Sequence, residues 1–136
     1  MAVFTPVSRS ELDSFVAGYD LGDVISFTGI DSGIENSNFF VETTAGHWVL
    51  TVFERLEPGQ LPFYLDLMHH LANKQVPCPN PMPARNGNSL GELAGKPAAL
   101  VTRLPGHAQM QPGPEHCDAV GRVLAQMHLA AESYAG

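Results

Sequence analysis

The chain has 136 residues, 44% of them hydrophobic, and a formal net charge of −7. This length suits one domain with its own core, the composition excludes a disordered chain, and the negative charge argues against nucleic acid as a partner, because such binders need a basic surface. No apolar run approaches the roughly 20 residues of a membrane span, and no signal peptide pattern opens the chain, so we expect a cytoplasmic protein without membrane partners.

A helix is predicted near the N-terminus. Ser8 and Glu11 form the S-x-x-E pattern of a capping box. Apolar side chains then recur at helical spacing, at Leu12, Phe15, Val16 and Tyr19. We expect Gly22 to end this helix.

Three strands should follow, over residues 24–30, 39–44 and 47–53. Ala45 and Gly46 separate the last two and suit a tight hairpin turn. A polar, glycine-containing loop is expected from Asp31 to Asn38. Backbone N–H groups of such a loop can approach an anion closely, although most loops of this composition are only turns.

The helical period returns after Pro58 and Gly59. Apolar residues at Leu61, Leu65, Met68 and Ala72 mark one face of a helix that should end near Lys74. His69 and His70 are adjacent in it, and adjacent helical side chains point in different directions, so they do not predict a metal site. The two cysteines, Cys78 and Cys117, also lack metal spacing and are interpreted as free thiols.

The remaining chain predicts a proline-rich connector, two strands and a final helix. A turn is expected at Asn86-Gly87, a short strand at 89–93, a turn at Ala94-Gly95 and a buried strand at 97–104. The final helix, about residues 115–132, carries an apolar face of Val120, Val123, Leu124, Met127 and Ala131. Five strands with a helix inserted after the third indicate an α+β fold.

In this order the elements resemble the N-terminal part of the aminoglycoside phosphotransferase and choline kinase superfamily, which are small-molecule kinases with a protein-kinase-like fold. Within it, bacterial homoserine kinases are most similar. The similar stretches are GIENSNFFVETTAGHWVLTVFE, LPFYLDLMHHLANKQVPCPNPMPARNG, KPAALVTRLPGH and HCDAVGRVLAQMHLAA. Each stretch is weak alone, and their joint spacing from Phe4 to Ala131 makes the resemblance specific.

The resemblance implies a kinase-like N-lobe over residues 1–104, namely a five-stranded antiparallel sheet with an inserted helix, and the start of a truncated C-lobe over 105–136. It also implies ATP with Mg²⁺ as cofactors. The hinge would be Val101 to Leu104, with adenine bonded to main-chain groups of Thr102 and Leu104, and Val49 would line the roof of the adenine pocket. The loop over the phosphates, with backbone donors, would comprise Gly33, Ile34, Glu35, Asn36, Ser37 and Asn38.

Two departures from the family pattern matter. Thr51 stands where kinases of this fold usually place a lysine that pairs with the α- and β-phosphates, and a hydroxyl brings no charge. Asp66 lies roughly where the acidic partner of that lysine would be, or is simply a solvated residue. Second, no HGD-type catalytic loop or later Asp motif occurs, so no catalytic residue is assigned here and the Mg²⁺ ligands are expected in a missing C-lobe.

The sequence is therefore interpreted as an N-terminal fragment, inactive alone, of an enzyme that transfers the ATP γ-phosphate to the side-chain hydroxyl of homoserine in threonine biosynthesis. Two alternatives stay open: a superfamily kinase acting on an aminoglycoside, choline or a sugar, and a non-catalytic binding or pairing module. Without a covering lobe, the apolar face of the final helix should either fold back on the strands or form a homodimer.

Overall fold

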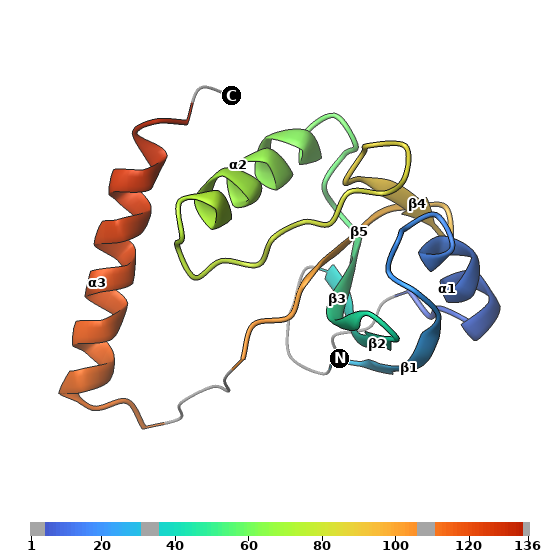
Figure 1. Cartoon of the computed structure of the whole chain (residues 1–136), viewed down its shortest axis with the longest axis horizontal. Helices are drawn as coiled ribbons and strands as arrows, with labels where there is room; N and C mark the ends of the chain where they lie inside the picture. The colour runs from blue at the N-terminus through green and yellow to red at the C-terminus, as the bar shows by residue number, and fades with distance from the viewer. Residues whose placement is uncertain (1–4, 31–35, 106–110, 135–136) are drawn as a thin grey trace.

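The structure is a computed structural model that describes residues 5–30, 36–105 and 111–134. Its elements in chain order are α1 (Arg9–Val16), β1 (Val24–Gly29), β2 (Asn36–Thr43), β3 (Gly46–Phe53), α2 (Leu61–Asn73), β4 (Gly91–Leu93), β5 (Lys96–Thr102) and α3 (Pro114–Ala131). The strands form one five-stranded sheet in the order β1-β2-β3-β5-β4, with every neighbouring pair antiparallel. The α+β fold with a helix inserted after the third strand is thus confirmed (Figure 1).

The main core lies between the sheet and α1. Because successive strand residues point to opposite faces, one face of β2, β3 and β5 buries Phe39, Val41, Leu50, Val52 and Leu100. They pack with a second group from α1 and its surroundings, namely Leu12, Val16, Tyr19, Leu21 and Val24. The opposite face of the sheet looks towards α2 (Figure 1), which buries Leu61, Leu65 and Leu71.

The local signals at the first helix are confirmed at its start and wrong at its end. The Ser8 hydroxyl accepts from the Glu11 N–H and the Glu11 side chain accepts from the Ser8 N–H, so the capping box is present. The helix ends at Val16, well before Gly22. Tyr19 lies beyond the helix and is still only 3% exposed, because the chain folds back over the core there. Helical spacing from Leu12 to Tyr19 thus reflects burial in the same core and does not make Tyr19 part of the helix.

Strand boundaries also differ from the expected ones. The strand β2 begins at Asn36, so the loop does not extend to Asn38. The strand β5 ends at Thr102, which leaves Leu104 in the segment that follows. The Ala94-Gly95 turn is confirmed, with positive φ angles of 53° and 77° at its two residues, the backbone of a tight hairpin turn.

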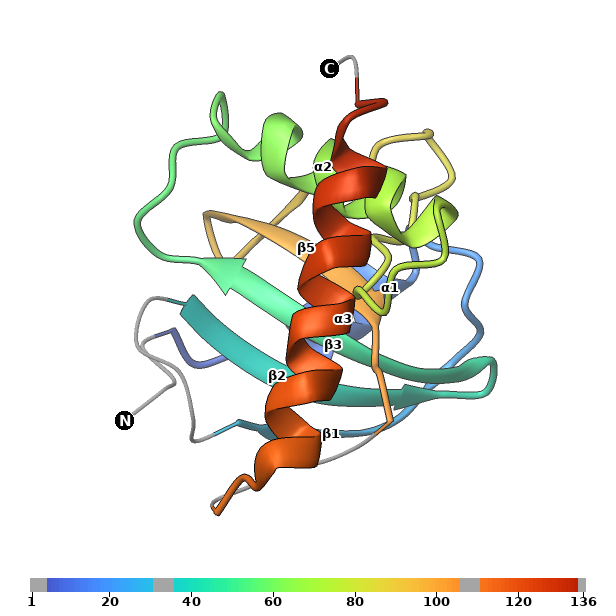
Figure 2. The same ribbon diagram turned by 90° about the vertical axis from the view of Figure 1, so that its left-hand side faces the viewer.

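The helix α3 stands apart from the sheet, beyond α2, and crosses in front of the sheet when viewed from that side (Figure 2). None of its residues is buried. Its C-terminal end meets α2, where His70 Nε2 donates to the Ala130 carbonyl at 2.8 Å and the Tyr134 ring contacts Phe63 and His70. The apolar face keeps large exposed side chains such as Val120 and Leu124. In the described part of the chain, no helix has the length and apolar character to cross a membrane.

Candidate functional site

A cavity of about 450 Å³ lies on the α2 side of the sheet. The pleat of the sheet selects every second residue of β2 and β3 for its wall. Helix α2 and the stretch after β5 supply the other walls. The lining residues are Asn36, Asn38, Phe40, Val49, Thr51, Phe53, Leu65, Met68, Pro79, Val101, Thr102, Arg103 and Leu104.

One end of the cavity is apolar. Phe40 pairs with Val49 across β2 and β3, and Val49 pairs with Val101 across β3 and β5. Directly opposed residues share a face, so the three side chains form a continuous row across the sheet. Met68 and Leu104 also line the cavity. This end suits a flat, weakly polar group such as a heterocyclic base.

The other end is uncharged and carries polar side chains beside Phe53, which pairs with Asn36. Asn38 pairs with Thr51 across β2 and β3, one pleat further along the strands than Phe40 and Val49. The Thr51 hydroxyl donates to the Asn38 side-chain oxygen at 2.9 Å, and the Asn38 Nδ2 lies 3.4 Å from the Asn36 carbonyl. Amide and hydroxyl groups at this end can hydrogen-bond a polar ligand without adding charge.

A single cation borders the cavity among the described lining residues. Arg103 follows β5, and its guanidinium lies 3.8 Å from the centroid of the Phe40 ring. Such a stacked contact contributes about 0.5–1 kcal/mol at an exposed position. Because it stacks on Phe40, the positive charge belongs to the apolar end of the cavity.

The strand β5 is held to the proline-rich connector beside the cavity. The Thr102 N–H donates to the Asn80 carbonyl at 3.0 Å, and the Asn80 N–H donates to the Thr102 hydroxyl at 2.9 Å. Further along, the Met82 N–H donates to the Leu100 carbonyl at 2.8 Å. Since the Thr102 N–H is already used, a ligand at this edge would have to meet other main-chain groups.

The structure brings most of the expected site residues to this cavity. Val49, Thr51, Val101, Thr102 and Leu104 all line it. Gly33, Ile34 and Glu35 lie outside the described residues. The expectation that residues 36–38 form a loop is wrong, because all three pair with β3 as part of β2. Pairing with a neighbouring strand overrides the low strand preference of asparagine.

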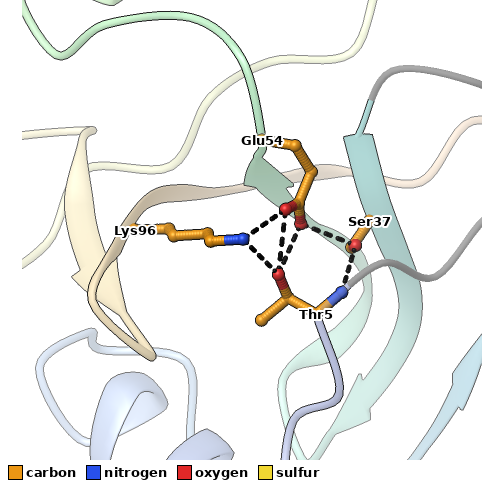
Figure 3. A network of polar contacts seen from close by, with 4 residues as sticks. All are labelled: Thr5, Ser37, Glu54 and Lys96. Atoms are coloured by element: carbon orange, nitrogen blue, oxygen red, sulfur yellow. Dashed lines mark hydrogen bonds and ion pairs between the residues drawn. The ribbon is translucent and has the colours of Figure 1, made fainter.

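Ser37 is the expected site residue that lies elsewhere. Its neighbours Asn36 and Asn38 face the cavity, so its own side chain points to the opposite face of the sheet, where it is fully buried. There it donates to Glu54 at 2.7 Å and accepts from the Thr5 N–H at 2.9 Å. Figure 3 shows these groups with Lys96 as one polar network.

The network is built around the Glu54 carboxylate. The Lys96 Nζ lies 2.5 Å from Glu54 Oε1 and also donates to the Thr5 hydroxyl at 2.9 Å. The Thr5 hydroxyl lies within 2.9 Å of both Glu54 oxygens (Figure 3). Burial by itself would raise the pKa of Glu54, but hydrogen bonds from Lys96, Thr5 and Ser37 and the charge of Lys96 together lower it from its ordinary 4.5. The lysine is therefore neutralised by Glu54 on the face away from the cavity.

Metal-ligating groups do not gather in the described part of the chain, where no three His, Cys, Asp or Glu side chains could hold an ion together. Asp66 is exposed on α2 and lines a different depression from the cavity. His69 binds Asn80 and Asn73, and His70 binds the end of α3. Cys78 and Cys117 are both free, as expected.

Sequence reasoning missed several lining residues, notably Phe40, Phe53, Met68, Pro79 and Arg103. Strand alternation could have found the first two, because Phe40 shares a face with Asn38, and Phe53 shares one with Val49 and Thr51. No local signal marks Arg103 or Pro79, which reach the cavity only through the path of the chain around β5.

Known proteins with similar sequences are kinases and other phosphotransferases. A sequence profile of the phosphotransferase enzyme family matches residues 26–135. Homoserine kinase of Paraburkholderia phytofirmans is 58% identical over 136 residues, which is 100% of this chain and 41% of that protein. Homoserine kinase of Burkholderia vietnamiensis is 59% identical over 135 residues, 99% of this chain and 41% of that protein. The chain thus spans about two fifths of the length of these relatives.

Two solved kinases share the fold. An amicoumacin kinase, in complex with AMP-PNP, Ca²⁺ and its ligand, has a TM-score of 0.73 at 14% identity, covering 95% of this chain and 41% of that one. Spectinomycin phosphotransferase, in complex with ADP and spectinomycin, has a TM-score of 0.70 at 12% identity, covering 93% of this chain and 39% of that one. The sheet with its inserted helix is the N-terminal part of this kinase fold. With 110 consecutive positions, residues 26–135, matched by the family profile, the chain belongs to the phosphotransferase enzyme family.

Proposed function

We propose that this chain is the nucleotide-binding part of a homoserine kinase, an enzyme that transfers the ATP γ-phosphate to the side-chain hydroxyl of homoserine. The observation that carries the proposal is the 58–60% identity to homoserine kinases along almost the whole chain. The cavity supports it, because an apolar row beside a polar end suits a base with a phosphate tail. Residues 1–104 are then the N-lobe with the hinge at its end, and residues 105–136 begin the C-lobe.

The nucleotide base would lie on Val49 and Val101, at the edge formed by Thr102 and Leu104. Its phosphates would extend towards Asn38 and Thr51. Residues 33–36 would cover the phosphates with backbone donors, in line with the glycine at position 33. Ser37 has no direct part in this assignment, since its side chain lies on the far face of the sheet.

The described residues fit a nucleotide base but do not fit a Mg²⁺ site, which needs several oxygen ligands in near-octahedral geometry. We therefore place the Mg²⁺ ligands and the group that orients the acceptor hydroxyl in the part of the relatives that this chain does not span. By itself the chain should bind ATP weakly and should not phosphorylate homoserine.

A chimera tests the proposal. This chain would replace the matching 136 residues of the Paraburkholderia phytofirmans homoserine kinase, with the unaltered relative and the isolated chain as controls. We expect homoserine phosphorylation within about tenfold of the relative from the chimera, and none from the isolated chain. A well-folded chimera that binds no ATP would instead favour a non-catalytic module.

The acceptor needs a separate test. If the reading frame continues past residue 136 into an HGD-x-x-x-x-N motif, the extended protein should be assayed with homoserine, choline and spectinomycin. If choline or spectinomycin were phosphorylated faster than homoserine, that compound would become the proposed acceptor, and the proposed nucleotide site would stand unchanged.

We further propose that the isolated chain forms a homodimer through α3 and that the enzyme is cytoplasmic. Three large apolar side chains of α3 are exposed, namely Val120 (65%), Leu124 (48%) and Leu129 (67%). An apolar surface that favours a partner is formed by Val120, Val123, Leu124 and Met127. A two-fold axis would let one such face cover another. The free thiols of Cys78 and Cys117 agree with a reducing compartment.

A further inference from the structure

The polar end of the cavity contains one hydrogen-bonded side-chain pair whose geometry decides which group is left for a ligand. The Thr51 hydroxyl donates its only hydrogen to Asn38 Oδ1 at 2.9 Å. A hydroxyl has one donor, so in this arrangement Thr51 has none to offer a ligand. The residue at the position of the usual kinase lysine therefore acts on its neighbour.

The orientation of the Asn38 amide follows from its other contact. Its Nδ2 lies 3.4 Å from the Asn36 carbonyl oxygen. Turning the amide over would place two acceptor oxygens against each other, so the orientation with Nδ2 towards Asn36 is the favourable one. An amide nitrogen carries two hydrogens, and the second has no partner among the described residues. Because Asn38 lines the cavity, that N–H is available to a ligand there.

The positions of the nearby charged side chains also indicate that a ligand at the polar end meets neutral groups. The one cation that lines the cavity within the described part is Arg103, which stacks on Phe40 at the apolar end. Lys96 lies on the opposite face, bound to Glu54 and Thr5. A phosphate at the polar end would thus meet neutral hydrogen-bond donors from these walls.

We propose that the Asn38 carboxamide is a side-chain ligand for the nucleotide's phosphates in this cavity, and that Thr51 is a positioning residue that holds it. This inference rests on the proposed nucleotide-binding function. It assigns recognition to a neutral N–H group directed by a hydroxyl, in place of a charge at position 51. The base, which lies one pleat away on Phe40, Val49 and Val101, should not sense either residue.

Titrations of the 136-residue chain with adenosine and ADP, followed by NMR chemical shifts, separate the two ends of the cavity. Asn38→Asp keeps the shape and turns the donor into an anion. It should weaken ADP binding about tenfold or more, the value of a hydrogen bond to a charged group, and leave adenosine within about twofold. The matched control is Asn88→Asp, the same charge change in the exposed 86–88 turn, which should alter neither ligand.

Thr51 requires a readout that a purely structural role would not move. Thr51→Val removes the hydroxyl at nearly constant shape and should weaken ADP about three- to tenfold with adenosine unchanged, since a misaligned amide retains part of its bond. Thr51→Ser should restore ADP affinity. Adenosine binding by each variant also shows that the cavity is still folded.

Three results would overturn the inference. Equal losses of adenosine and ADP in Asn38→Asp would assign Asn38 to folding alone. Unchanged ADP affinity in Asn38→Asp would exclude the amide as a phosphate ligand while leaving the proposed function intact. If the unaltered chain bound neither adenosine nor ADP, the inference and the proposed nucleotide site would both be wrong.

Discussion

The polar network of Thr5, Ser37, Glu54 and Lys96 allows a quantitative test of how the segment around Thr5 is bound to the sheet. Glu54 has only 9% of its side chain exposed, whereas that of Lys96 is 41% exposed. Replacing Lys96 by Met keeps most of the aliphatic stem and removes the ammonium. The carboxylate then stays buried with only Thr5 and Ser37 as donors.

The expected cost lies between two known limits. Removing one partner of a fully buried ion pair costs about 3–5 kcal/mol, and a fully exposed pair contributes about 0.2–1 kcal/mol. Because one partner here is buried and the other is partly solvated, we expect Lys96→Met to lower the free energy of unfolding by about 2 kcal/mol at pH 7. Glu54→Gln in the same background should recover part of that loss, since it removes the unpaired charge.

The pH dependence follows from the direction of the pKa shift. In the wild type the folded-state pKa of Glu54 lies below its ordinary value of 4.5, so its stabilisation is present above pH 4.5 and is lost as the pH falls through the lower folded pKa. Lys96→Met removes the hydrogen bond and the charge that Lys96 supplies, so the folded pKa of Glu54 in this variant should lie above its wild-type value. The stability gap between the two proteins should therefore be widest near neutral pH and narrow below about pH 4.5.

Urea unfolding followed by tryptophan fluorescence provides the measurement. Trp48 is the only tryptophan, lies against the core and donates from Nε1 to the Thr43 hydroxyl at 2.9 Å, so its emission should report global unfolding. A gap under about 0.5 kcal/mol at pH 7, or one that does not change between pH 7 and pH 4, would refute the assignment of Lys96 as the charge that keeps Glu54 ionised.

Two further predictions use the same chain. Gly22→Ala should lower the free energy of unfolding by at least about 2 kcal/mol, because φ is +79° there and an added Cβ would lie 1.9 Å from Thr44 Oγ1. The control is Gly87→Ala, at φ +87° with nothing near an added Cβ, which should cost only the backbone strain of about 1 kcal/mol. Equal losses of stability in urea unfolding would contradict the clash with Thr44. Leu124→Glu should convert a dimer to a monomer in sedimentation equilibrium, because it puts a charge on the apolar face of α3; a wild type that is monomeric at high micromolar concentration would rule out pairing.

Signals that act within a few residues were enough to predict much of this fold. The capping box of Ser8 and Glu11 and the positive-φ turn at Ala94-Gly95 depend only on local backbone geometry, and both are present. The apolar spacing from Leu61 predicted α2 to within a residue of its end. The resemblance to small-molecule kinases assigned Val49 and Thr51 to the nucleotide site, and both line the cavity.

Contacts between distant segments decided the rest. Asn36 to Asn38 are polar residues that read as loop, and they are strand only because β3 pairs with them. The polar network joins residues up to 91 positions apart in sequence, namely Thr5, Ser37, Glu54 and Lys96. No local sequence feature of these residues predicts which of them bind each other. The same holds for the Asn38–Thr51 pair, since the register of two strands determines which side chains face each other. The sequence thus determined where most helices and strands lie, because those preferences are local. The tertiary structure determined where β2 begins and which polar groups share a face of the sheet, and with it the chemistry of the cavity.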